Sequence, residues 1–151
     1  SRTPPAFMIE EMVHRNAAFC IYHASQMPKV SVASLVVEPG PGDALFVTVE
    51  LVNERWIPSR TALAAEKGIG RPDLVTLAGD DIVVVAGGTD ASRFELSEFE
   101  AAEFEPGRLR LDGGIPGHGT ERLRWIVRGS GPFTVTYDSQ KAGVVSASGT
   151  L

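Results

Sequence analysis

Three histidines are the side chains of this sequence best suited to hold a metal ion, and one of them begins an H-x-x-E tetrad, His118-Gly119-Thr120-Glu121. Such a pair can share a zinc ion when the imidazole and the carboxylate converge, but a catalytic zinc needs a third protein ligand. His14 and His23 lie on a predicted helix, about 13 Å apart along its axis at 1.5 Å per residue. They cannot both reach an ion at His118, so we expect a solvated loop histidine and a strand-edge glutamate.

The sequence offers little for nucleophilic catalysis. Cys20 is the only cysteine and His23 follows it by three residues, close enough for contact on a helix. A catalytic pair also needs a third group to orient it and donors to stabilise an oxyanion, and neither is evident. No G-x-S-x-G elbow occurs around the serines. We expect Cys20 to pack as a small hydrophobe.

The acidic turns are the last candidates for ion binding. Asp80-Asp81 and Asp90 have carboxylates that suit calcium, but their spacing matches no calcium loop. Aspartates are common in turns because they hydrogen-bond the backbone. In the acidic stretch 94–107 we expect Phe94 and Leu96 to face the core and the carboxylates to face water. From the sequence we therefore assign no catalytic, cofactor-binding or metal-ligating residue in this chain.

Composition narrows the classes of partner. The chain has 151 residues, 43% of them hydrophobic, and a formal net charge of −5. No basic cluster is present, which argues against a nucleic-acid partner. No apolar run approaches the roughly 20 residues of a membrane span. Because the chain begins with Ser1 rather than Met, we expect it to be a piece of a longer or processed polypeptide.

Residues 5–25 have the pattern of an amphipathic helix, with Pro5 in its first turn and Pro28 beyond its end. Its stripe recurs at three- and four-residue spacing and consists of Ile9, Met12, Val13, Asn16, Phe19, Cys20 and His23. One helix cannot bury such a stripe by itself. We expect it to dock on the domain that follows or on a domain outside this chain.

After Pro28 the hydrophobic period changes from 3.6 to two, which predicts half-buried strands at 44–53, 121–129 and 132–139. The short link after 128 predicts a hairpin between the last two. Weaker strand patterns lie at 30–37, 59–66, 74–77, 82–85, 93–99, 108–111 and 143–151. Many short strands separated by Gly, Pro and Asp turns predict an antiparallel immunoglobulin-like β-sandwich over residues 28–151, preceded by the helix of residues 1–27.

Several segments resemble the C-terminal part of bacterial zinc carboxypeptidases of the carboxypeptidase A family. They are YHASQMPKV (22–30), LFVTVELVNERWIPSRTA (45–62), RPDLVTLAG (71–79) and LRWIVRGSGPFTVTYDSQKAG (123–143). The most specific pieces are N-x-x-W-I-P-S at 53–59 and R-W-I-V-x-G-S-G at 124–131. The resemblance covers most of the chain.

Some members of that family carry a β-sandwich after the catalytic domain. The catalytic domain itself has an H-x-x-E pair, a distant third zinc-binding histidine and a late catalytic glutamate. Only thirty residues follow Glu121 and none of them is histidine, so these residues cannot be mapped here. The resemblance implies that zinc and the active site lie upstream of Ser1, and that residues 1–27 form the junction to that domain.

We therefore expect a non-catalytic accessory domain whose partner is an upstream catalytic domain of the same polypeptide. Trp56, Ile57, Met12 and Phe19 are the expected interface residues, because large apolar side chains anchor interfaces. The alternative is an independent module that binds polysaccharide, cell wall or peptide. Without its partner domain, the fragment is expected to self-associate weakly through an exposed apolar patch.

Overall fold

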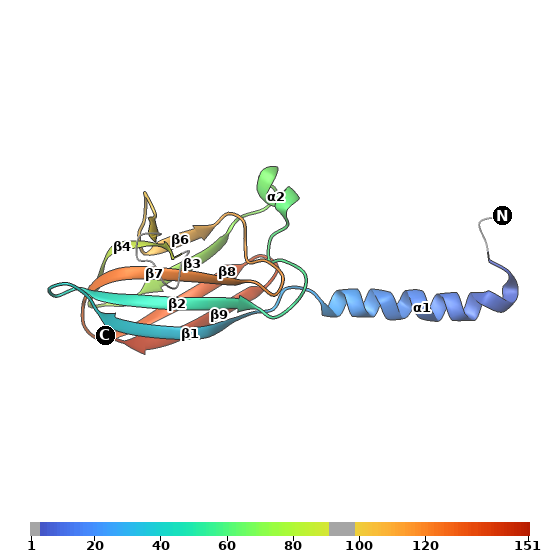
Figure 1. Ribbon diagram of the computed structural model, residues 1–151, viewed down its shortest axis with the longest axis horizontal. Helices are drawn as coiled ribbons and strands as arrows, with labels where there is room; N and C mark the ends of the chain where they lie inside the picture. The colour runs from blue at the N-terminus through green and yellow to red at the C-terminus, as the bar shows by residue number, and fades with distance from the viewer. Residues whose placement is uncertain (1–3, 91–98) are drawn as a thin grey trace.

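The computed structural model describes residues 4–90 and 99–151, with the side chain of Asp90 excepted. A long helix precedes two packed antiparallel sheets (Figure 1). This arrangement confirms the predicted antiparallel β-sandwich with an N-terminal helix. No helix among the described residues combines the length and apolar character needed to cross a membrane.

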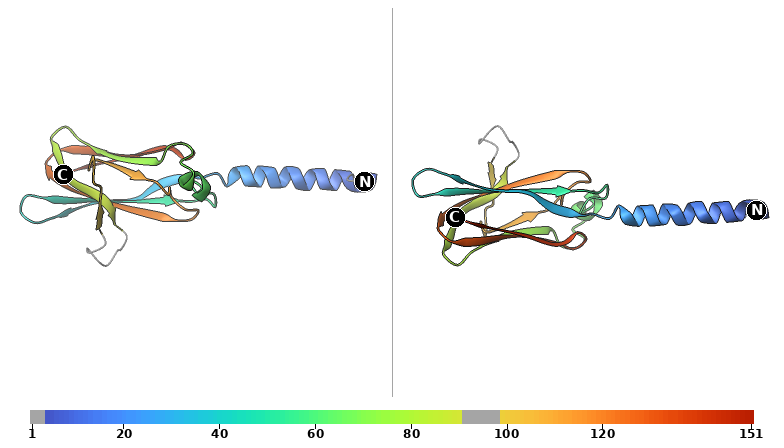
Figure 2. Two further views of the ribbon diagram at one scale, coloured as in Figure 1. Left: turned by 90° about the horizontal axis from the view of Figure 1, so that it is seen from above. Right: turned by 90° about the horizontal axis from the view of Figure 1, so that it is seen from below.

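Helix α1 spans Ala6–Ser25 and extends away from the sandwich as a straight rod (Figures 1 and 2). None of its residues is buried, so the stripe does not dock on the sandwich, which was the first of the two expected alternatives; the other, a partner outside this chain, stays a prediction. Phe7, Met8 and Ile9 are all exposed, and three successive helical residues point about 100° apart. Apolar side chains thus lie around the helix as well as on the predicted stripe.

The first sheet contains strands β1 (Val30–Pro39), β2 (Leu45–Asn53), β7 (Thr120–Gly129), β4 (Ile82–Asp90) and β5 (Phe99–Ala101), in that spatial order. The second contains β6 (Arg108–Leu111), β3 (Asp73–Ala78), β8 (Pro132–Ser139) and β9 (Gly143–Thr150). Figure 2 shows the two layers edge-on.

The core lies between the sheets and follows the period-two pattern of the sequence. β2 contributes Val47, Val49 and Leu51, all fully buried. Trp125 of β7 and Tyr137 of β8 are the largest buried side chains and face each other's sheets across the core. Such alternation leaves the intervening side chains on the outer faces.

Two predicted elements differ in the structure, and a third falls mostly outside the described residues. β7 and β8 are not a hairpin, because they belong to opposite sheets and residues 130–131 cross between the layers. Residues 59–66 form no strand: Thr61 caps the short helix α2 (Ala62–Glu66) by accepting from Ala64 N. The pattern at 93–99, with Phe94 and Leu96, lies almost wholly outside the described residues.

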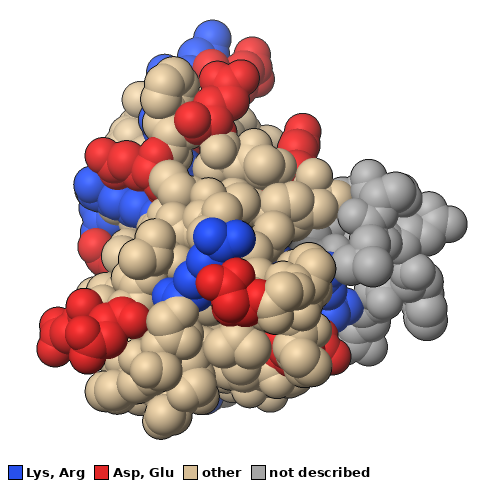
Figure 3. Space-filling view, turned by 90° about the vertical axis from the view of Figure 1, so that its left-hand side faces the viewer, with Lys and Arg blue, Asp and Glu red and all other residues tan. Residues whose placement is uncertain are grey.

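The end of the sandwich opposite α1 carries acidic and basic side chains mixed together (Figure 3). On this face the described arginines and lysines are interspersed with carboxylates. One such ion pair joins Arg128 Nε to Asp43 Oδ1 at 3.1 Å. The charge on this face is therefore mixed rather than concentrated in one sign.

Candidate functional site at the helix–sandwich junction

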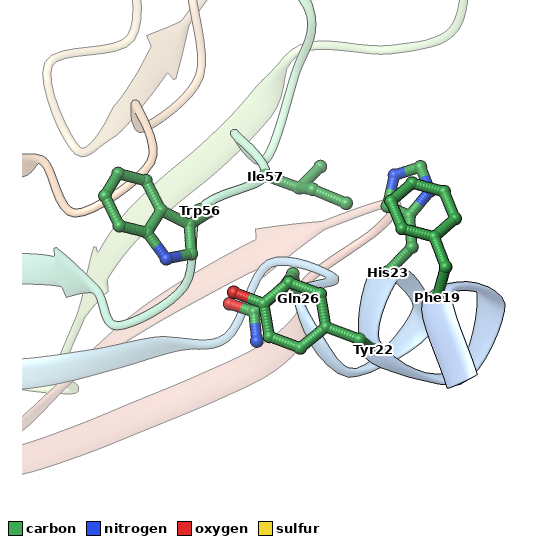
Figure 4. A pocket seen from close by; sticks show the side chains of 6 residues that line it. All are labelled: Phe19, Tyr22, His23, Gln26, Trp56 and Ile57. Carbon is green, nitrogen blue, oxygen red and sulfur yellow. The ribbon is translucent and has the colours of Figure 1, made fainter. Parts of the chain in front are cut away.

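A pocket of about 300 Å³ opens where α1 meets the sandwich (Figure 4). The last two turns of α1 and its cap form one wall, and the loop after β2 forms the other. Ile57 points from the loop toward the rings of the helix wall (Figure 4). The residues that line the pocket are Phe19, Tyr22, His23, Gln26, Trp56 and Ile57.

Buried Asn53, at the end of β2, holds the loop wall in place. Its side-chain oxygen accepts from the backbone N–H groups of Lys29 and Arg55, each at 3.2 Å. Its amide nitrogen donates to the carbonyls of Ile57 (2.9 Å) and Pro116 (3.2 Å). One fully buried amide thus joins three chain segments, and buried polar groups that are fully bonded in this way fix local structure.

The loop between β6 and β7 packs against the backbone of Trp56. Gly117 packs so closely that a Cβ atom there would lie 1.9 Å from the carbonyl oxygen of Trp56. His118 adopts a positive φ of 50° and donates its backbone N–H to the carbonyl of Arg55 at 2.9 Å. Its imidazole meets the indole of Trp56 edge-to-face, with centroids 4.5 Å apart. The H-x-x-E tetrad at 118–121 therefore places its histidine beside Trp56 of the pocket.

Polar contacts of the residues at and just beyond the C-terminal end of α1 attach the helix to the sandwich. Ile57 N donates to the carbonyl of Gln26, the C-cap of the helix, at 3.2 Å. Lys29 Nζ lies 2.7 Å from Glu54 Oε2, and Ser31 Oγ donates to Glu54 Oε1 at 2.9 Å. The hydrogen bond from Lys29 lowers the pKa of Glu54 below its usual value, with that from Ser31 adding to it. The direction of α1 is thus set by backbone and ion-pair contacts rather than by packing.

The pocket is apolar, and its side chains reach water. Trp56 is 66% exposed, Phe19 63% and Tyr22 57%. The rings of Phe19 and His23 lie 5.8 Å apart on the helix wall. When a partner covers rings with this much exposed surface, the burial of their apolar area is favourable. The arrangement suits capture of an apolar or aromatic group.

Residues 29–150 match the model of a family that is described as a domain of unknown function, DUF8731. The chain belongs to the DUF8731 family. No curated protein gave a significant match. No solved structure did so either. The matched residues of the DUF8731 domain cover the sandwich and the loop wall of the pocket, and α1 precedes them.

The structure brings three of the four expected interface residues together in this DUF8731 chain. Phe19, Trp56 and Ile57 all line the pocket, whereas Met12 lies seven residues earlier on α1, about 10 Å away along its axis. Sequence reasoning missed Tyr22 and Gln26. Tyr22 follows Phe19 by three residues, and that spacing was the available signal for its place on the same face.

The other predicted positions that the structure describes are not brought together into one site. Among residues 4–90 and 99–151, no three His, Cys, Asp or Glu side chains are grouped for a metal ion. Glu121 lies on β7, where partial burial raises the pKa of its carboxyl group. Cys20 is exposed on α1, so the expectation that it packs as a small hydrophobe is wrong for this chain.

One buried polar cluster in the DUF8731 domain lies away from the pocket. Asp73 Oδ2 accepts from Ser59 Oγ (2.5 Å) and from Tyr137 Oη (2.7 Å). Ser59 Oγ in turn accepts from the backbone N–H of Ile115 at 2.7 Å. Burial is the largest cause that raises the pKa of Tyr137. These mutual bonds tie β3, β8 and two loops together inside the sandwich.

Proposed function

We propose that this chain is the non-catalytic accessory part of a larger enzyme. In this proposal α1 and the junction pocket attach the sandwich to a catalytic domain of the same polypeptide. The observation that carries it is α1 itself, a helix of 20 residues without a buried side chain. An isolated helix of that length is only marginally stable in water, so its apolar side chains need a partner.

The exposed side chains indicate what kind of surface the partner presents. Large apolar residues line α1 and continue into the pocket beside Trp56 and Ile57. A large exposed apolar patch of this kind usually marks a site of contact with another protein. The complementary face is therefore apolar and extended, as the surface of a packed domain is.

The sequence resemblance names the candidate partner as a zinc carboxypeptidase-like catalytic domain. N-x-x-W-I-P-S, one of the segments that carry the resemblance, supplies Asn53, Trp56 and Ile57. These residues build the loop wall of the pocket and the hydrogen-bond network behind it. In this proposal zinc belongs to the catalytic domain, and the sandwich stabilises or positions that domain.

Deleting residues 28–151 from the parent polypeptide tests the proposal. We expect the melting temperature of the catalytic domain to fall by about 2 °C or more, because loss of about 1 kcal/mol shifts the melting temperature by about 2–4 °C in a domain of about 150–250 residues. A Trp56→Ala, Ile57→Ala double variant should reproduce part of the fall, and Val144→Ala, on the far strand β9, should not. Unchanged stability and peptidase activity after the deletion would refute the accessory role.

A second candidate function rests on the exposed rings. Trp56 and Tyr22 flank one open pocket, and such rings can stack on a sugar or a peptide side chain. An independent binding module would quench or shift Trp56 fluorescence on titration with soluble cell-wall fragments. Saturable binding that Trp56→Ala abolishes would favour the module, whereas the accessory role predicts no such response.

A further inference from the structure

Among the described strands, four lie at the edges of the two sheets, and three of these carry features that discourage pairing with another chain. β1 has a register irregularity between Val32 and Ser34 and ends in Glu38-Pro39. The described part of β5 is three residues long. β6 is four residues long and exposes Arg108 and Arg110.

β9 is the exception. It spans eight residues, pairs with β8 without a register irregularity, and contains neither a charged residue nor proline. Its side chains are small, and Val144 is 65% exposed. Natural edge strands with this length and composition lack the usual protection, which makes them templates for strand addition.

The direction of the β9 backbone groups follows from one hydrogen bond. Leu151 N donates to the carbonyl of Gly131, which places the 131–151 pair among the hydrogen-bonded pairs of the β8–β9 ladder. Because bonded and non-bonded pairs alternate, residues 145, 147 and 149 bond β8. The N–H and C=O groups of Val144, Ser146, Ser148 and Thr150 therefore point away from the sheet. No described strand pairs with them.

We propose that β9 pairs with β9 of a second copy of this chain, antiparallel and across a two-fold axis at Ala147. In this register Val144 lies opposite Thr150 of the second copy, and Ser146 lies opposite Ser148. All four outward-directed residues are then hydrogen-bonded, and each pair exchanges two N–H···O bonds. The four-stranded sheet then continues into its symmetry mate, and the contact uses the same strand of both copies, as a two-fold interface requires.

The side chains of β9 suit a second copy better than a foreign strand. On the outer face Ser148 Oγ lies 3.0 Å from Thr134 Oγ1, and Ser146 Oγ lies 3.2 Å from Thr136 Oγ1. The pairing extends these rows of hydroxyls across the axis, and it sets β-branched Val144 against Thr150. No like charges meet on either strand. The inference does not depend on the accessory role, because β9 shares no residue with α1 or the pocket.

Sedimentation of the full chain between about 10 μM and about 1 mM tests the pairing. We expect a concentration-dependent dimer. Ser146→Pro removes an outward N–H without breaking a β8 bond, so it should raise the dimer dissociation constant about tenfold or more. Ser146→Val keeps that N–H and should leave the constant nearly unchanged. Loss of native circular dichroism in Ser146→Pro would shift the test to the charge variants.

Two charge variants test the register without proline. Ser146→Lys and Ser148→Glu should each weaken self-pairing, because like charges become diagonal neighbours across the axis. An equimolar mixture should form a heterodimer, since Lys and Glu then lie opposite each other. A chain that stays monomeric at all concentrations, or a dimer insensitive to these substitutions, would overturn the proposal.

Discussion

At the scale of single residues, the junction depends on close approach and on one buried amide. Gly117 permits the backbone of one loop to touch Trp56, and Asn53 bonds the same loop from below. Neither residue could act chemically on a ligand. They keep the indole and Ile57 in fixed positions, which lowers the entropic cost of binding.

Replacing Gly117 by alanine should disrupt that approach. The added Cβ would lie 1.9 Å from a backbone carbonyl, so the two loops must separate. We expect the free energy of unfolding in urea to fall by about 1–3 kcal/mol. Gly113→Ala is the matched control, because a Cβ there meets nothing within 4 Å. Equal stability of the two variants would mean that the loops do not need this contact.

Tyr137 gives the domain a pH dependence of known sign. Burial raises the pKa of its phenol above the unfolded value of about 10, so the folded state keeps the proton that the unfolded state loses. Stability should therefore be full below pH 10 and fall above it, by up to about 1.4 kcal/mol per pH unit. Urea titrations from pH 8 to about pH 11 measure this slope.

The chain has two tyrosines, so the second one provides a matched control for the substitution of Tyr137. Tyr137→Phe should remove the phenol's part of the slope, and it should also lower stability at neutral pH because Asp73 loses a hydrogen bond. Tyr22→Phe should leave the stability at neutral pH unchanged, since Tyr22 is exposed on α1. An unaltered slope in Tyr137→Phe would contradict the assigned cause.

At the scale of elements, local pattern predicted individual elements better than their partners. The period-two runs at 44–53, 121–129 and 132–139 became β2, β7 and β8, and the helix of 5–25 became α1. The hairpin prediction failed because a two-residue link can also cross between sheets. Gly129 and Gly131, both at positive φ, make that crossing, and sequence distance alone does not reveal it.

The candidate site was predictable to the same degree. Trp56 and Ile57 stood out because large apolar side chains anchor interfaces. Tyr22 and Gln26 line the pocket only because of the direction in which α1 leaves the sandwich. That direction is set by Lys29, Glu54 and the carbonyl of Gln26, whose contacts join positions about 25 residues or more apart.

At the scale of the whole molecule, the sandwich and α1 are structurally independent in this chain. The sandwich has its own core and the Asp73 hydrogen-bond cluster, and α1 contributes no buried residue to either. Such independence is what an element shared with another domain would show. It also predicts how the isolated chain unfolds.

Removing residues 1–25 should leave the melting temperature of the sandwich within about 2 °C of that of the full chain, because no packed side chain is lost. The Gln26 carbonyl that accepts from Ile57 is retained in that truncation. In the full chain, helical circular dichroism should decay before the sandwich melts, since α1 alone is marginal. Asn53→Ala is the contrasting variant and should lower the sandwich's melting temperature, because it leaves buried backbone groups unpaired. A fall of more than about 5 °C on truncation would show that α1 supports the sandwich directly, and α1 would then not be free for a catalytic domain.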